Sequence, residues 1–152
     1  MSSDGRTPGT MRLVAEERPY PMVRAVLTAA VREGLQLRDF PGAGDGLLCR
    51  WAKALAECVA RGECAGGVVF CDDPALVCCV ANKLPGLRAA AVTTVAQAAR
   101  ATLTLGVNLL AIEAPGRTYF EMRQMVRLLC TGPTCPDGPA ATLQELDGHA
   151  HR

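Results

Sequence analysis

The sequence has almost no histidine. Its two histidines, His149 and His151, stand at the carboxyl end of the 152-residue chain, so the rest of the protein has no imidazole for proton transfer or metal binding. No two cysteines have the C-x-x-C spacing either. Together these absences exclude an ordinary zinc site, and we expect neither a metal nor a cofactor.

The chain also lacks an excess of either charge and any long apolar run. Sixteen Lys and Arg residues oppose fifteen Asp and Glu residues, and the formal net charge is +1. We therefore expect neither nucleic acid nor an anionic membrane as a partner. No uncharged apolar run approaches the roughly 20 residues that a membrane span needs. Residues 1–10 have no apolar stretch and carry Asp4, which argues against a secretory signal, so we expect a cytoplasmic protein.

Cysteine, by contrast, is abundant, with eight residues. Most of them lie inside apolar segments. With no secretory signal, free thiols packed as small hydrophobic side chains in a reducing cell fit this pattern better than disulfides. The length and the 49% content of hydrophobic residues suit one domain with a core of ordinary size.

Apolar periodicity predicts strands and helices in alternation. Strands are expected at 11–15, 35–40, 66–71, 87–93 and 107–112. Helices are expected at 21–33, 47–60, 73–82, 95–105 and 118–130. This order predicts an α/β fold, a Rossmann-like three-layer sandwich with a five-stranded parallel sheet. We assign the domain to residues 11–131, with 1–10 and 132–152 as terminal extensions.

Ligands of such sheets bind beyond the carboxyl ends of the strands. Four acids follow two of these ends: Glu16 and Glu17 after the first strand, and Asp72 and Asp73 after the third. We expect them to repel one another, which raises the pKa of a carboxylate in the group. The alternative is that they bind Mg²⁺ or another hard cation through their oxygens.

One segment has a specific pattern. Its elements are Gly66-Gly67, Cys71, an Ala-Asn-Lys triplet at 81–83, Pro85-Gly86 and the strand at 108–112. The pattern resembles the ribose-5-phosphate isomerase B family, which includes the LacA and LacB subunits of galactose-6-phosphate isomerase, and the likeness spans about residues 11–131. It implies a Rossmann-like fold and a homodimer or larger oligomer with active sites at the subunit interface. It also implies an aldose–ketose isomerase that acts on a sugar or sugar phosphate.

The resemblance also implies roles for individual residues. Cys71 stands where the family often has the base that moves a proton between C1 and C2 through an enediolate. Glu16 and Glu17 stand near the family's Asp-His pair, Arg50 in the place of a Tyr-Pro-His segment, and Asn108 at a retained position. Asp72 and Asp73 belong to the same substrate-binding region. The ordinary alternatives are a buried structural thiol at Cys71 and a solvated arginine at Arg50.

Other family features are missing. Where the family has a Gly-rich loop, residues 72–74 read Asp-Asp-Pro. A proline offers no N–H to an oxyanion, and Asp73 as a helix N-cap would use an amide itself. Carboxylates beside Cys71 raise the pKa of its thiol. The family's ring-opening histidine aligns with Thr104, and its late phosphate-binding arginines align with 132–141, which contain no cation.

We therefore expect a divergent member of this sugar-phosphate isomerase family with weak or no standard activity. One alternative is an active isomerase on a different sugar that uses Cys71 as its base. Another is a non-catalytic subunit that associates with a catalytic paralogue. A nucleotide-binding domain is disfavoured, because neither G-x-G-x-x-G nor G-x-x-x-x-G-K-[ST] follows a strand.

Overall fold

Five parallel strands form one sheet in the order β2-β1-β3-β5-β4. The structure, a computed structural model, describes residues 11–131 and 138–150. The strands are β1 (Arg12–Glu16), β2 (Leu37–Asp39), β3 (Gly66–Cys71), β4 (Ala89–Val92) and β5 (Leu109–Glu113). The predicted α/β fold with a five-stranded parallel sheet is confirmed.

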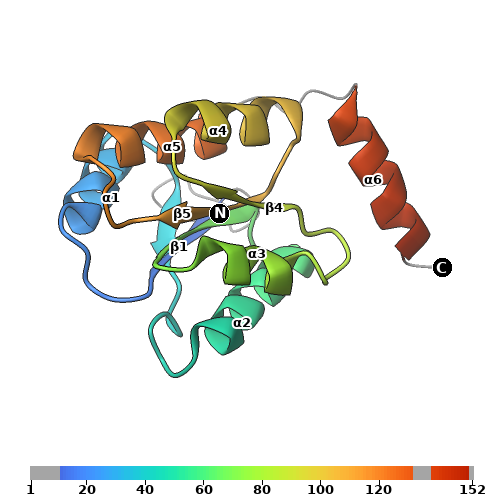
Figure 1. Cartoon of the computed structure of the whole chain (residues 1–152), viewed down its shortest axis with the longest axis horizontal. Helices are drawn as coiled ribbons and strands as arrows, with labels where there is room; N and C mark the ends of the chain where they lie inside the picture. The colour runs from blue at the N-terminus through green and yellow to red at the C-terminus, as the bar shows by residue number, and fades with distance from the viewer. Residues whose placement is uncertain (1–10, 132–137, 151–152) are drawn as a thin grey trace.

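Helices cover both faces of the sheet (Figure 1). They are α1 (Val23–Arg32), α2 (Leu48–Ala60), α3 (Pro74–Ala81), α4 (Val95–Ala99), α5 (Tyr119–Thr131) and α6 (Pro139–Ala150). Side chains of β3 alternate between two cores, as a strand requires: Val68 and Phe70 pack with α1, α4 and α5, while Val69 and Cys71 pack with α2 and α3. None of the described helices combines the length and the apolar character that crossing a membrane would require.

The two glycines that open β3 explain how the central strand fits between its neighbours. A Cβ on Gly66 would lie 2.4 Å from the carbonyl oxygen of Asn108, and a Cβ on Gly67 would lie 2.9 Å from a terminal carbon of Leu55. Glycine therefore lets the start of β3 approach the chain before β5 and the helix α2. From this start β3 runs through the middle of the sheet to Cys71.

The structure differs from the sequence prediction in two elements. The helix expected over 95–105 changes type after α4, because Arg100–Thr104 form a π-helical turn. Within it the Thr102 hydroxyl donates to the Ala98 carbonyl at 2.9 Å, a side-chain bond that competes with the regular helical pattern. In addition, α6 lies in the extension 132–152, where no helix was predicted, and stands beside the sandwich (Figure 1). The other extension, 1–10, lies outside the described residues.

Candidate active site

Cys71, the predicted base, ends β3 inside the core below α2 and α3. None of its surface is exposed. Burial raises the pKa of its thiol to about 12, and the carboxylates of Glu17 and Asp73 add to the increase, while a hydrogen bond from the Asp73 backbone N–H opposes it. The predicted direction is therefore correct, but burial rather than the neighbouring acids is its main cause.

The backbone after Cys71 offers few open N–H groups. The N–H of Asp72 donates to Glu17 Oε1 at 2.9 Å, and that of Asp73 faces the Cys71 sulfur. Asp73 is the N-cap of α3, as predicted, and its carboxylate accepts the Leu76 N–H at 3.2 Å. Of the two residues between Asp73 and Leu76, the first is Pro74, which has no N–H. This loop therefore lacks the row of free amides that holds an oxyanion.

The mutual repulsion expected among the four acids is wrong for Asp72. Arg18 binds the Asp72 carboxylate with two nitrogens, Nε at 3.1 Å and Nη2 at 2.9 Å. The Tyr20 hydroxyl donates to the same carboxylate at 3.0 Å, and the Arg18 guanidinium lies 4.4 Å above the Tyr20 ring. Chiefly because of Arg18, the pKa of Asp72 is held below its usual value. Burial and the hydrogen bond to Asp72 both raise the pKa of Tyr20.

The two glutamates after β1 serve different neighbours. Glu16 accepts hydrogen bonds from Arg24 Nε at 3.0 Å and from the Tyr20 backbone N–H at 3.3 Å, so it is directed to α1. Glu17 is directed to the end of β3 through its bond with Asp72. Among the described residues, no group of three or more His, Cys, Asp or Glu side chains is placed to hold a metal ion. Glu16, Glu17 and Asp72 thus join β1, α1 and β3, and Asp73 caps α3, instead of converging on a cation.

The other two predicted residues lie on different elements from Cys71. Asn108 precedes β5 and therefore lies at the amino-terminal edge of the sheet, while Cys71 lies at the carboxyl edge. There Asn108 accepts the Arg88 backbone N–H at 2.9 Å and donates to the Gly86 carbonyl at 2.8 Å, which holds the loop before β4. Arg50 is exposed on α2. Asn108 therefore does not belong to the group around Cys71 within one chain.

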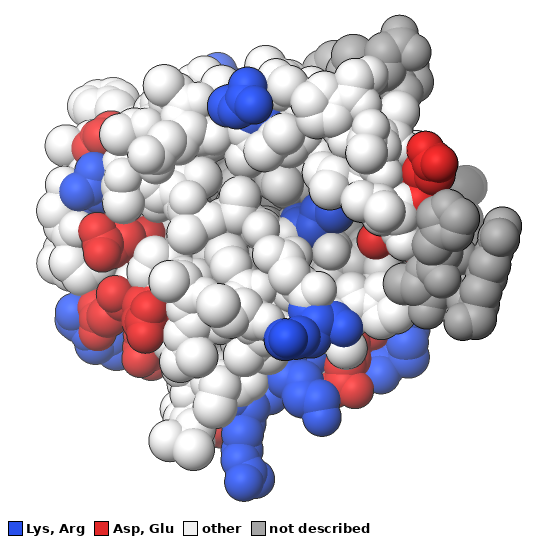
Figure 2. Space-filling model, turned by 45° about the vertical axis from the view of Figure 1, so that its right-hand side comes forward, with Lys and Arg blue, Asp and Glu red and all other residues white. Residues whose placement is uncertain are grey.

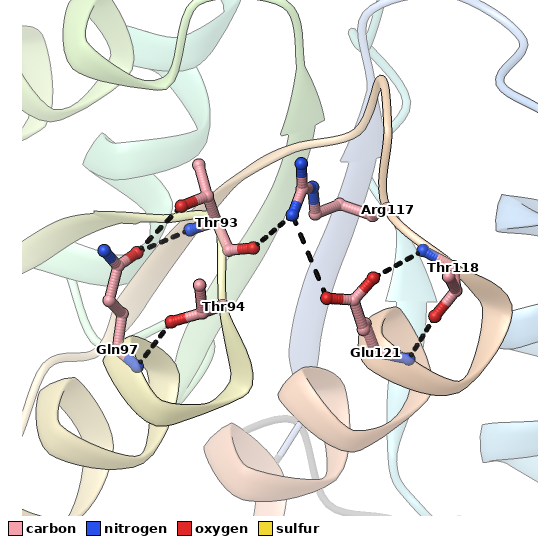
Figure 3. Close-up of polar contacts among 6 residues, drawn as sticks. All are labelled: Thr93, Thr94, Gln97, Arg117, Thr118 and Glu121. Carbon is pink, nitrogen blue, oxygen red and sulfur yellow. Dashed lines mark hydrogen bonds and ion pairs between the residues drawn. The ribbon is translucent and has the colours of Figure 1, made fainter.

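Arg117, which the sequence analysis overlooked, supplies a cation at the carboxyl edge (Figure 3). It follows β5, and its Nη1 donates to the carbonyl of Thr93 after β4 and lies 3.9 Å from Glu121 Oε2. Its Nε is buried without a hydrogen-bond partner, which is rare for a polar group. Its place just after β5, at the edge where ligands of such sheets bind, is the signal that could have identified it.

The helix N-termini beside Arg117 are closed by their own side chains (Figure 3). Thr118 and Glu121 of α5 cap each other: the Thr118 hydroxyl accepts the Glu121 N–H at 3.1 Å, and the Glu121 carboxylate accepts the Thr118 N–H at 2.9 Å. At α4, Thr94 accepts the Gln97 N–H at 3.0 Å, and the Gln97 side chain accepts the Thr93 N–H at 2.7 Å. These reciprocal caps occupy N–H groups at the starts of α4 and α5 and leave Arg117 as a cation beside them.

Comparisons with known proteins agree with the fold and with the pattern around β3. The family model described as Ribose/Galactose Isomerase matches residues 15–131. The type B ribose 5-phosphate isomerase of Trypanosoma brucei has 22% sequence identity and a TM-score of 0.75, with 92% of this chain and 99% of that chain covered. Ribose-5-phosphate isomerase B of Mycoplasma genitalium, solved with bound ribulose-5-phosphate, has 18% identity and a TM-score of 0.76, with 93% and 96% covered.

A third structure, a ribose 5-phosphate isomerase of Thermotoga maritima, has 15% identity and a TM-score of 0.75, with 91% of this chain and 97% of that chain covered. No curated protein matches the chain. At identities this low the solved structures establish the fold, whereas the family model spans most of the sequence. The resemblance found in the sequence is thereby confirmed, and the chain belongs to the Ribose/Galactose Isomerase family.

Proposed function

We propose that this protein is a divergent sugar-phosphate isomerase with weak or no activity on the standard substrates of its family. The observation that carries the proposal is that the thiol at the end of β3 is buried and the backbone amides after it are already hydrogen-bonded; we call this the closed end of β3. Moving a proton between C1 and C2 needs a base that reaches the sugar and donors that stabilise the enediolate oxygen. Cys71 is wholly buried, and the amides of Asp72 and Asp73 already have partners within the chain.

The protonation state of Cys71 supports the same proposal. With a pKa of about 12, the thiolate fraction at pH 7 is on the order of 10⁻⁵. A substrate would also have to separate Asp72 from Arg18 and Tyr20 before the loop could turn its amides outward. Arg117 still places a guanidinium at this edge, so binding of a phosphorylated sugar can persist where turnover does not.

The decisive experiment is a coupled assay with ribose 5-phosphate and with allose 6-phosphate. We expect no turnover above that of the heat-inactivated protein, with an isomerase of the family as the positive control. The variants Cys71→Ala and Cys64→Ala form a matched pair, because Cys64 is a buried cysteine that lies before β3, away from the carboxyl edge. Turnover that Cys71→Ala abolishes and Cys64→Ala retains would overturn the proposal in favour of an active isomerase with Cys71 as its base.

We also propose that the chain forms a homodimer or larger oligomer through the outer face of α3. This helix, PALVCCVA, and the neighbouring edge strand β4, AAAV, contain no charged residue, and Leu76 on α3 is 38% exposed. α3 faces the viewer in Figure 1, and Figure 2 shows a broad uncharged area on this side of the molecule. A helix that is apolar on all sides is normally covered, and family membership favours a second copy as the cover.

Sedimentation equilibrium tests this association. The wild type should sediment at twice the 16.0 kDa of one chain or more, and Leu76→Glu should lower the mass to that of one chain. Phe120→Glu is the matched control, because Phe120 is exposed on α5 at the opposite face of the sheet. A monomeric wild type would refute the proposal, and a paralogue that purifies with the chain from its native source would favour a mixed oligomer.

The seven described cysteines are free thiols, which supports a cytoplasmic location.

A further inference from the structure

A polar cavity lies at the amino-terminal edge of the sheet, opposite to the edge that holds Cys71. Its volume is about 240 Å³. Two arginines line it, Arg12 at the start of β1 and Arg88 just before β4, together with Thr102 of the π-helical turn and the loop 106–108 before β5. Nothing in the proposed function uses this cavity.

Arg88 is held firmly in the wall of the cavity. Its side chain is 17% exposed, and its Nε donates to the carbonyl of Gly106 at 3.1 Å. Its Nη1 donates to Asp147 Oδ2 at 2.7 Å. A guanidinium has five N–H donors, so this group retains further donors beyond these two bonds. A fixed, mostly buried guanidinium is the usual protein partner of carboxylates and phosphates.

The anion that Arg88 binds in the structure comes from α6. Asp147, 26% exposed, is carried by a helix that stands beside the sandwich and makes few contacts with it (Figure 1). A carboxylate is the ordinary partner of a mostly buried guanidinium, and here Asp147 fills that role for Arg88. The chain therefore places a carboxylate of a loosely packed helix on a guanidinium that lines the polar cavity.

We propose that this cavity is a binding site for a small oxyanion such as inorganic phosphate, which competes with Asp147 for Arg88 and releases α6 when it binds. Competition follows because both anions use the same guanidinium donors. In the wild type the Asp147 carboxylate is present at the high effective concentration of an intramolecular ligand, so it weakens the binding of a free ion.

Titration calorimetry with inorganic phosphate tests the competition. Asp147→Asn should bind phosphate at least tenfold more tightly than the wild type. Glu145→Gln is the matched control, because it removes the same charge from an exposed position on the same helix, and it should bind as the wild type does. Arg88→Gln added to Asp147→Asn should abolish the gain. In the wild type, phosphate should also speed hydrogen exchange of the amides of α6.

Amide chemical shifts locate the site without a variant of Arg88. On addition of phosphate to Asp147→Asn, the signals of Gly106 and Asn108 should move, while those of Thr94 and Gln97 at the opposite edge should not. The proposal fails if Asp147→Asn gains no more affinity than Glu145→Gln, or if the shifts concentrate at the carboxyl edge near Arg117. If the proposed function at the carboxyl edge were refuted, the expected binding of phosphate at the Arg88 cavity would be unchanged, because the two sites lie at opposite edges of the sheet.

Discussion

The rate at which iodoacetamide alkylates Cys71 measures most directly how accessible and how ionised the thiol at the end of β3 is. The reagent reacts with the thiolate. At pH 7 an ordinary cysteine with a pKa of about 8.5 is a few per cent thiolate, whereas a pKa of about 12 leaves on the order of 10⁻⁵. Ionisation alone therefore predicts that Cys71 reacts more than about a thousandfold slower in the folded protein than in the unfolded chain, and burial adds steric protection.

The assay compares one residue with itself. Fragment-resolved mass spectrometry follows Cys71 in the folded protein and in the chain unfolded in urea, so the comparison does not depend on how exposed the other cysteines are. Because the thiolate fraction rises tenfold per pH unit below the pKa, the folded rate should still be rising between pH 8 and pH 10. Labelling within tenfold of the unfolded rate at pH 7, or protection of Cys71 by a sugar phosphate, would refute the reasoning and favour an active thiol base.

Three further outcomes follow. Gly66→Ala should cost about 3 kcal/mol of stability in urea unfolding, because its Cβ meets a backbone carbonyl, and Gly67→Ala only about 1 kcal/mol, because a side-chain end can move; equal losses would contradict this. Arg18→Gln should raise the pKa of Asp72 in an NMR titration, since Arg18 is the main cause of its lowering; an unchanged pKa would show that the pair does not form. Folding keeps the Cys71 thiol protonated while the thiol of the unfolded chain ionises, so the free energy of unfolding falls as pH rises from about 9 toward 12. Between pH 7.5 and pH 10.5, the free energy of unfolding of Cys71→Ala should fall by about 2 kcal/mol less than that of the wild type.

Local patterns in the sequence predict most of the fold. The buried strand β3 and the N-cap at Asp73 follow from residues that are neighbours in the chain, and the structure has both. The π-helical turn was not predicted, because it depends on where the Thr102 hydroxyl finds an acceptor. The helix α6 was missed as well, since its anchoring bond joins Asp147 to Arg88, a residue 59 positions away.

The candidate site could be predicted only in part, for a similar reason. Sequence order placed Glu17, Asp72 and Asp73 at one edge of the sheet, and the structure agrees. Their charges suggested repulsion, but repulsion among acids depends on which cations lie nearby. Arg18 reaches Asp72 across 54 positions of sequence, a pairing that no local pattern reveals.

The contacts that close the end of β3 also explain how the chain keeps its fold without the loop of its relatives. Glu17 accepts the Asp72 N–H, and Arg18 binds the Asp72 carboxylate, so two consecutive residues after β1 hold both the backbone and the side chain of the residue after β3. An open loop for an oxyanion must leave such donors unpaired until substrate arrives, at a cost to stability. In this chain the same donors stabilise the junction of β1 and β3 permanently. A single substitution of Glu17 would therefore free one amide, that of Asp72, and leave the proline and the buried thiol in place, so reopening the site requires several changes at once.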